Sequence, residues 1–179
     1  MPYSINIRSD NVSSAAIKTL WKECAQLEGQ PSMEALNYPP HLGLAVYDDI
    51  DNALLFDAFD AAFANMPKVI VRFERLGYFE TPDRIILWAD PILPRAISEV
   101  HDRIHTLINP GSCRPNYRPG AWVPHCSLAT AIDGSRRDAA IALTRRSIAP
   151  IEVEFDVADC AIFPPVKVVR EQGLSCTAQ

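Results

Sequence analysis

Two histidines stand in the same short pattern at distant places in this chain. The pattern is P-H-x-x-L-A, and it surrounds His41 in PPHLGLAV and His125 in VPHCSLA. Histidine has an ordinary pKa of about 6.5, so it can hold or release a proton near neutral pH. Two imidazoles brought to one groove could therefore act as a general base and a general acid.

The residue two places after each histidine differs, being Gly43 in the first copy and Ser127 in the second. Alternate residues of a strand point to the same face, so Ser127 would lie beside His125, whereas Gly43 would offer only its backbone N–H beside His41. A hydroxyl in that place can donate to a phosphate oxygen and stabilise charge in a transition state. In an in-line displacement at phosphorus, the attacking and leaving oxygens lie on opposite sides. A base on one side of the groove and an acid on the other would suit that reaction.

Four further residues near the motifs are candidates for substrate contact. Tyr38 and Trp122 precede the two motifs and could stack on a base at the mouth of the groove, or pack between the lobes. Tyr117 and Arg118 belong to a loop rich in proline and glycine, and could reach a phosphate or face solvent. Cys126 points away from its neighbouring histidine, so we interpret it as a core residue rather than a nucleophile.

A second pair of histidines, His101 and His105, lies four residues apart on a predicted helix. This spacing could present two imidazoles to a metal ion. No glutamate completes an H-E-x-x-H pattern, so we interpret the pair as part of an exposed helix face and predict no metal site. The sequence also lacks a glycine-rich phosphate loop, and we predict that the protein uses no cofactor.

Hydrophobic periodicity predicts mixed strands and helices around these motifs. We expect strands at 4–9, 41–47, 68–79, 84–88, 125–131 and 151–157, one or two further strands within 160–169, and helices at 12–28, 52–65, 94–108 and 135–146. Each motif strand precedes an acidic turn and an amphipathic helix, so the repeat predicts two similar lobes. We therefore predict one α+β domain over residues 1–179, with two pseudo-symmetric β-α lobes whose motif strands lie side by side and turn both imidazoles to one groove.

Composition and charge exclude several classes of protein. Apolar residues make up 48% of the 179, enough to bury a core, so a disordered chain is excluded. A net charge of −5 argues against a broad surface for long nucleic acid, although a small or terminal nucleotide remains possible. We find no apolar run long enough to span a membrane and no signal-peptide pattern. Five cysteines without a C-x-x-C pair predict a reducing cytoplasm.

The two motifs resemble those of the 2H phosphoesterase superfamily, and within it the 2′-5′ RNA ligase and cyclic nucleotide phosphodiesterase-like group. The resemblance rests on the paired H-x-[ST]-x strands and on the segment YRPGAWVPH from Tyr117 to His125, and it covers most of the chain in element order. It implies largely antiparallel sheets around a central groove and metal-independent chemistry on 2′,3′-cyclic phosphates, 2′-5′ linkages or related cyclic phosphodiesters. The second motif matches the family pattern, whereas the first departs from it at Gly43.

Two functions follow as expectations. In the first, the chain is a phosphoesterase in which His41 and His125 are base and acid, in an order the sequence leaves open, while Ser127 and the Gly43 N–H hold the phosphate. In the second, it is a nucleotide- or RNA-end-binding module in which Gly43 has weakened or abolished catalysis. The alternative to both is that each histidine is an ordinary strand residue satisfied by a local hydrogen bond.

Overall fold

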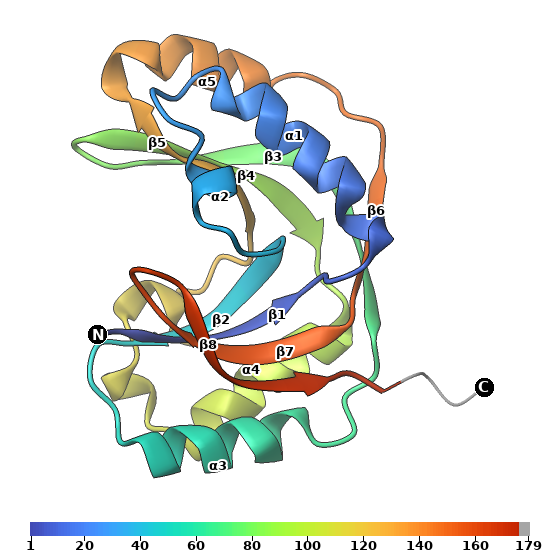
Figure 1. The fold of residues 1–179 in the computed structure, drawn as a ribbon, viewed down its shortest axis with the longest axis vertical. Helices are drawn as coiled ribbons and strands as arrows, with labels where there is room; N and C mark the ends of the chain where they lie inside the picture. The colour runs from blue at the N-terminus through green and yellow to red at the C-terminus, as the bar shows by residue number, and fades with distance from the viewer. Residues whose placement is uncertain (176–179) are drawn as a thin grey trace.

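Two four-stranded antiparallel sheets form the framework of the protein, which a computed structural model describes over residues 1–175 (Figure 1). The sheet of lobe one contains, in spatial order, β2 (His41–Tyr47), β1 (Tyr3–Arg8), β7 (Val157–Ile162) and β8 (Lys167–Gly173). The sheet of lobe two contains β5 (Cys126–Asp133), β4 (Arg84–Ile92), β3 (Val69–Glu80) and β6 (Ile151–Phe155). Every neighbouring pair is antiparallel, so the predicted α+β class and bilobal plan are confirmed.

Helices cover both sheets, but their order along the chain does not follow the lobes. The helices α1 (Ala15–Ala25), α2 (Ser32–Ala35) and α5 (Arg137–Thr144) pack on lobe two, while α3 (Asn52–Phe63) and α4 (Arg95–Leu107) pack on lobe one. The helices α1 and α2 therefore lie on lobe two although they precede β2, and β7 and β8 return to lobe one (Figure 1). The lobes are consequently interleaved along the chain.

Local capping explains where the helices begin. The Asp51 carboxylate accepts a hydrogen bond from the Leu54 N–H at 2.9 Å and so caps α3, as the acidic turn predicted. The Asn11 side chain instead caps the 3₁₀ turn η1 (Val12–Ser14), so α1 begins only at Ala15, three residues later than predicted.

Several boundaries differ from the sequence prediction. The helix predicted over 12–28 ends at Ala25. The helix predicted over 135–146 begins at Arg137, after the 3₁₀ turn η4 (Gly134–Arg136), and ends at Thr144. The strand predicted to end at residue 88 continues to Ile92 because it keeps its pairing with β3. The helix α2 was not predicted, since four residues are too few for a periodic signal.

The two motif strands occupy equivalent places in the two sheets. Both β2 and β5 are edge strands, and these edges contact each other between the lobes. At the contact the thiol of Cys126 lies against the backbone of His41 and is fully buried, in agreement with its interpretation as core. No helix within residues 1–175 is long and apolar enough to cross a membrane.

Candidate active site

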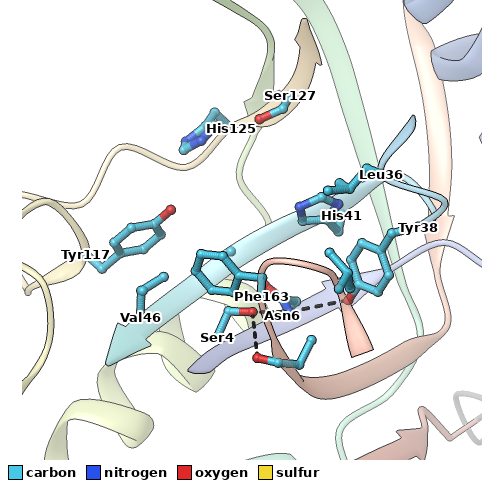
Figure 2. A pocket seen from close by; sticks show the side chains of 13 residues that line it. Ser4, Asn6, Leu36, Tyr38, His41, Val46, Tyr117, His125, Ser127 and Phe163 are labelled. Carbon is cyan, nitrogen blue, oxygen red and sulfur yellow. Dashed lines mark hydrogen bonds between the residues drawn. The ribbon is translucent and has the colours of Figure 1, made fainter. Parts of the chain in front are cut away.

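A pocket of about 180 Å³ lies between the two motif strands and draws its walls from both lobes. Six of the residues predicted from the sequence line it: Tyr38, His41, Gly43, Tyr117, His125 and Ser127. Figure 2 shows His125 and Ser127 on one side and His41 across the pocket from them. The repeat thus brings its two imidazoles and its one hydroxyl to a single cavity.

Each motif histidine is held by the carbonyl two residues before it. The Nδ1 atom of His41 lies 2.9 Å from the Pro39 carbonyl oxygen, and the Nδ1 atom of His125 lies 2.8 Å from the Val123 carbonyl oxygen. A carbonyl can only accept, so Nδ1 carries the hydrogen in both rings. In the neutral ring Nε2 is then an acceptor, and no group within residues 1–175 bonds to it in either histidine.

The proline of each motif accounts for this shared geometry. Pro40 and Pro124 stand between the accepting carbonyl and the histidine. A proline restricts the residue before it to extended conformations, which fixes the orientation of that residue's carbonyl. The repeated P-H dipeptide therefore encodes the same ring orientation twice.

Burial shapes the protonation of both rings. The pKa of His41 is lowered, first by desolvation, while the Pro39 carbonyl and the buried Asp159 carboxylate oppose the shift and His125 adds to it. The pKa of His125 is also lowered by desolvation, opposed by the Val123 carbonyl. Among residues 1–175, a carboxylate therefore favours the charged form of His41 and none favours that of His125.

A buried polar network lies behind His41. Asp159 is fully buried and accepts from the Tyr38 hydroxyl at 2.6 and 2.7 Å, from Asn6 Nδ2 at 3.0 Å and from Arg8 Nε at 2.7 Å. The Tyr38 ring in turn meets the edge of the His41 ring, with centroids 4.8 Å apart. Tyr38 is only 8% exposed, so it forms the wall behind His41 and does not stand at the mouth of the pocket.

Aromatic rings pack around His125, as the Tyr38 ring packs against His41. Its ring meets Phe79 edge-on, with centroids 5.0 Å apart, and Phe79 stacks on Trp88. A Cβ at Gly77 would lie 2.4 Å from Trp88, so only glycine allows the indole to lie across β3. Each histidine is thus in edge contact with a neighbouring aromatic ring, Tyr38 for His41 and Phe79 for His125.

Two predicted site residues, Trp122 and Arg118, do not line the pocket. Trp122 donates from Nε1 to the Gly43 carbonyl at 3.0 Å, so it packs between the loop and β2. Arg118 donates to the carbonyls of Cys113 and Gly111 at 2.8 and 2.9 Å. Arg118 is therefore a half-buried residue whose guanidinium ties the loop to itself, and it does not line the pocket.

The prediction that His101 and His105 form an exposed helix face was wrong. They are 3% and 6% exposed, and their Nε2 atoms lie 2.9 and 3.0 Å from one acceptor, the Tyr117 carbonyl. The His101 ring also stacks on Trp122, with centroids 4.0 Å apart and planes inclined by 7°. The pair fixes the loop that delivers Tyr117 to the pocket, and residues 1–175 contain no cluster of three or more His, Cys, Asp or Glu side chains placed to hold a metal ion.

Sequence reasoning missed Asp159 and the Phe79–Trp88 pair. One signal was available for Asp159, because it is a lone acid between the apolar Ala158 and Cys160 in a strand. No comparable signal marked Phe79 and Trp88, since aromatic residues in strands are ordinary core.

Comparison with known proteins decides the family. The model of the family described as the 2′-5′ RNA ligase superfamily matches residues 12–162. The chain belongs to this superfamily. The 2H phosphoesterase resemblance read from the two motifs is therefore confirmed, and membership of the 2′-5′ RNA ligase superfamily supports a phosphoesterase-type activity.

Solved structures share the fold over almost the whole chain. TT0787 of Thermus thermophilus has a TM-score of 0.63 at 14% identity, covering 99% of this chain and 100% of that one. LigT of E. coli in its apo form has a TM-score of 0.62 at 13% identity, covering 98% and 99%. Usb1 of Kluyveromyces marxianus has a TM-score of 0.55 at 10% identity, covering 94% and 97%. At these identities the likeness is one of fold, and no curated protein sequence matches this member of the superfamily significantly.

Proposed function

We propose that this chain is a phosphoesterase that opens a cyclic phosphate, on a nucleotide or an RNA end, or cleaves a 2′-5′ phosphodiester. The observation that carries the proposal is the matched pair of imidazoles, each held at Nδ1 by a backbone carbonyl and each without a partner at Nε2 among residues 1–175. Because Nδ1 is bonded to the backbone, the Nε2 atom of each imidazole is the one that can exchange a proton with a ligand in the pocket.

We assign the acid to His41 and the base to His125. Asp159 favours the protonated form of His41, whereas no carboxylate acts on His125 within the described chain. In hydrolysis of a 2′,3′-cyclic phosphate, neutral His125 takes a proton from the attacking water as its oxygen bonds to phosphorus. His41 gives its proton to the ribose oxygen as the bond from that oxygen to phosphorus breaks. Ser127 donates to a non-bridging oxygen, and its strand position is held by Trp21 Nε1, which donates to the Ser127 carbonyl at 3.0 Å.

The charge and size of the pocket support a small phosphodiester. Among residues 1–175, no lysine, arginine, aspartate or glutamate lines it, so its donors are neutral. A phosphodiester carries one negative charge and is better suited to such a set than a terminal phosphate, which carries close to two. The pocket of about 180 Å³ is also smaller than sites for drug-sized ligands, which start near 300 Å³. It suits one phosphate and part of its sugar, and we infer no long nucleic-acid surface.

Gly43 supports a second candidate, a module that binds a nucleotide or RNA end with little or no turnover. The first motif lacks the side-chain hydroxyl that the second has in Ser127. Loss of one transition-state donor costs about 10²–10³ in rate, so catalysis could fall below a useful level while binding remains. Binding without hydrolysis would identify this case.

The direct test is a hydrolysis assay with purified protein on 2′,3′-cyclic nucleotides, 2′-5′ dinucleotides and an RNA ending in a cyclic phosphate. We expect turnover of at least one of these substrates, and a fall in kcat of about 10²–10⁴ in His125→Ala and in His41→Ala, because each removes one proton-transfer group.

Tyr78→Phe is the control, because Tyr78 is exposed on β3 and does not line the pocket. Turnover that survives His125→Ala unchanged would contradict the assignment of the two imidazoles.

A further inference from the structure

The space beside Gly43, where the first motif lacks a hydroxyl, is occupied by the side chain of Tyr117 from another element. A Cβ built on Gly43 would lie 3.2 Å from Cε1 and 3.7 Å from the hydroxyl oxygen of Tyr117. Ordinary contact begins at 3.4 Å, so the tyrosine ring occupies space that a serine or threonine at 43 would need. Tyr117 comes from the 3₁₀ turn η3 (Pro115–Tyr117), far from β2 in sequence.

The Tyr117 hydroxyl is free to act on a ligand. It lines the pocket with His41, His125 and Ser127, and no group within residues 1–175 accepts from it or donates to it. Figure 2 shows it pointing toward the side of the pocket that carries His125. Burial raises the pKa of this phenol above its usual value, so the hydroxyl keeps its hydrogen and remains a donor at neutral pH.

The backbone of Tyr117 is held on both sides, which fixes where its ring can lie. Its N–H donates to the Arg114 carbonyl at 3.0 Å, and its carbonyl accepts from His101 and His105 at 2.9 and 3.0 Å. Trp122, stacked on His101, donates in turn to the Gly43 carbonyl. The two positions that approach each other, 43 and 117, are therefore tied together through His101 and Trp122.

We propose that the Tyr117 hydroxyl donates to a non-bridging phosphate oxygen on the β2 side of the pocket, in place of a motif hydroxyl at position 43, and that Gly43 makes room for its ring. This rests on the proposed phosphoesterase function and deepens it. Under this assignment two neutral hydroxyls of the pocket lining, those of Tyr117 and Ser127, donate to the phosphate. In this proposal the Tyr117 hydroxyl replaces the hydroxyl that the first motif lacks at Gly43, so the site has not lost a donor.

The test begins with Tyr117→Phe, which keeps the ring and removes the hydroxyl. On a 2′,3′-cyclic nucleotide, we expect kcat/KM to fall by about a hundredfold, comparable with Ser127→Ala. Tyr78→Phe is the matched control, since the same atom is removed from a side chain outside the pocket, and should leave kcat/KM unchanged.

Gly43→Ser in the wild-type background distinguishes a hydroxyl donor replaced by Tyr117 from a hydroxyl donor that is missing. If Tyr117 supplies the donor, the added side chain crowds its ring and kcat/KM falls or stays level. A rise above wild type would overturn the proposal, because it would mean that a hydroxyl had been missing. Activity of Tyr117→Phe within about twofold of wild type, with Ser127→Ala impaired, would overturn it as well.

Calorimetric binding of a 2′,3′-cyclic nucleotide, measured in a His125→Ala background that suppresses turnover, keeps the proposal testable apart from turnover. We expect Tyr117→Phe to weaken affinity by about fivefold or more through one lost hydrogen bond, with Tyr78→Phe unchanged. If wild type binds without hydrolysing any substrate, the phosphoesterase function fails and this affinity ratio alone decides the role of Tyr117. If it neither binds nor hydrolyses, both proposals fail.

Discussion

At the scale of residues, the two histidines make activity sensitive to acidity. Burial lowers the pKa of both His41 and His125 below 6.5, so above that pH the free protein holds both rings largely neutral. The base is then available, but the acid has lost its proton. We predict a bell-shaped profile of kcat/KM centred below pH 6.5, with a fall approaching about tenfold per pH unit on the alkaline side.

Steady-state assays between about pH 4.5 and pH 8.5, spanning about two units on each side of an ordinary histidine, would measure this profile. The phosphodiester substrate keeps a single charge over this range, so it adds no limb of its own. An optimum for kcat/KM above about pH 7.5, one unit over the ordinary histidine value, would contradict the assignment of both groups.

The sequence predicted the residues that repeat and missed those that support them. His41, His125 and Ser127 could be singled out because two copies of one pattern stand in one chain. Asp159 could not be placed, because its three partners lie more than a hundred residues away in sequence and meet it only when β1 pairs with β7. The apolar neighbours of Asp159 mark its position as unusual, but no local pattern identifies the distant partners of such a network.

At the scale of elements, the loop before β5 depends on one indole. Trp122→Phe keeps a ring to stack on His101 but removes the N–H that donates to the Gly43 carbonyl. We predict a loss of about 1–2 kcal/mol in the free energy of unfolding, because a partly buried acceptor loses its partner. Urea denaturation at neutral pH would measure it.

Trp88→Phe provides a matched control within the same chain. The Trp88 Nε1 is buried and has no partner among residues 1–175, so the same truncation there removes no hydrogen bond. We expect the larger loss in Trp122→Phe, because only that variant removes a hydrogen bond. Equal losses in both would show that the indole at 122 acts through packing alone.

The elements themselves were largely predictable, and their partners were not. The strand at 41–47 was predicted with its observed ends, because hydrophobic alternation is a local signal. The burial of His101 and His105 was missed because it arises from the loop that folds back over α4. Packing of α1 on lobe two is likewise set by the tertiary structure, which a periodic pattern does not encode.

At the scale of the whole molecule, acid should unfold this protein early. All four histidines, His41, His101, His105 and His125, have lowered pKa values, each first through desolvation. The native state then binds fewer protons than the unfolded chain, so stability is full above the unfolded pKa of about 6.5 and is lost as pH falls below it.

We predict that the free energy of unfolding falls between about pH 7 and pH 5.5, by at most about 5 kcal/mol per pH unit if all four sites contribute fully. Urea titrations at fixed ionic strength across this range would measure it. His101→Gln with His105→Gln should flatten the slope by removing two of the four titrating groups. Stability that stays level or rises on acidification in this window would contradict the shared direction of the shifts.

The close approach of Gly43 and Tyr117 also bears on how such chains can diverge. A bulkier residue at 43 and a tyrosine at 117 compete for the same few ångströms, so neither position can change freely while the other stays. Among relatives that keep this loop, the two positions should covary: a serine or threonine at 43 with a smaller side chain at 117, and glycine at 43 with an aromatic phenol. An aligned set of such sequences would therefore contain few members with both hydroxyl groups and few with neither.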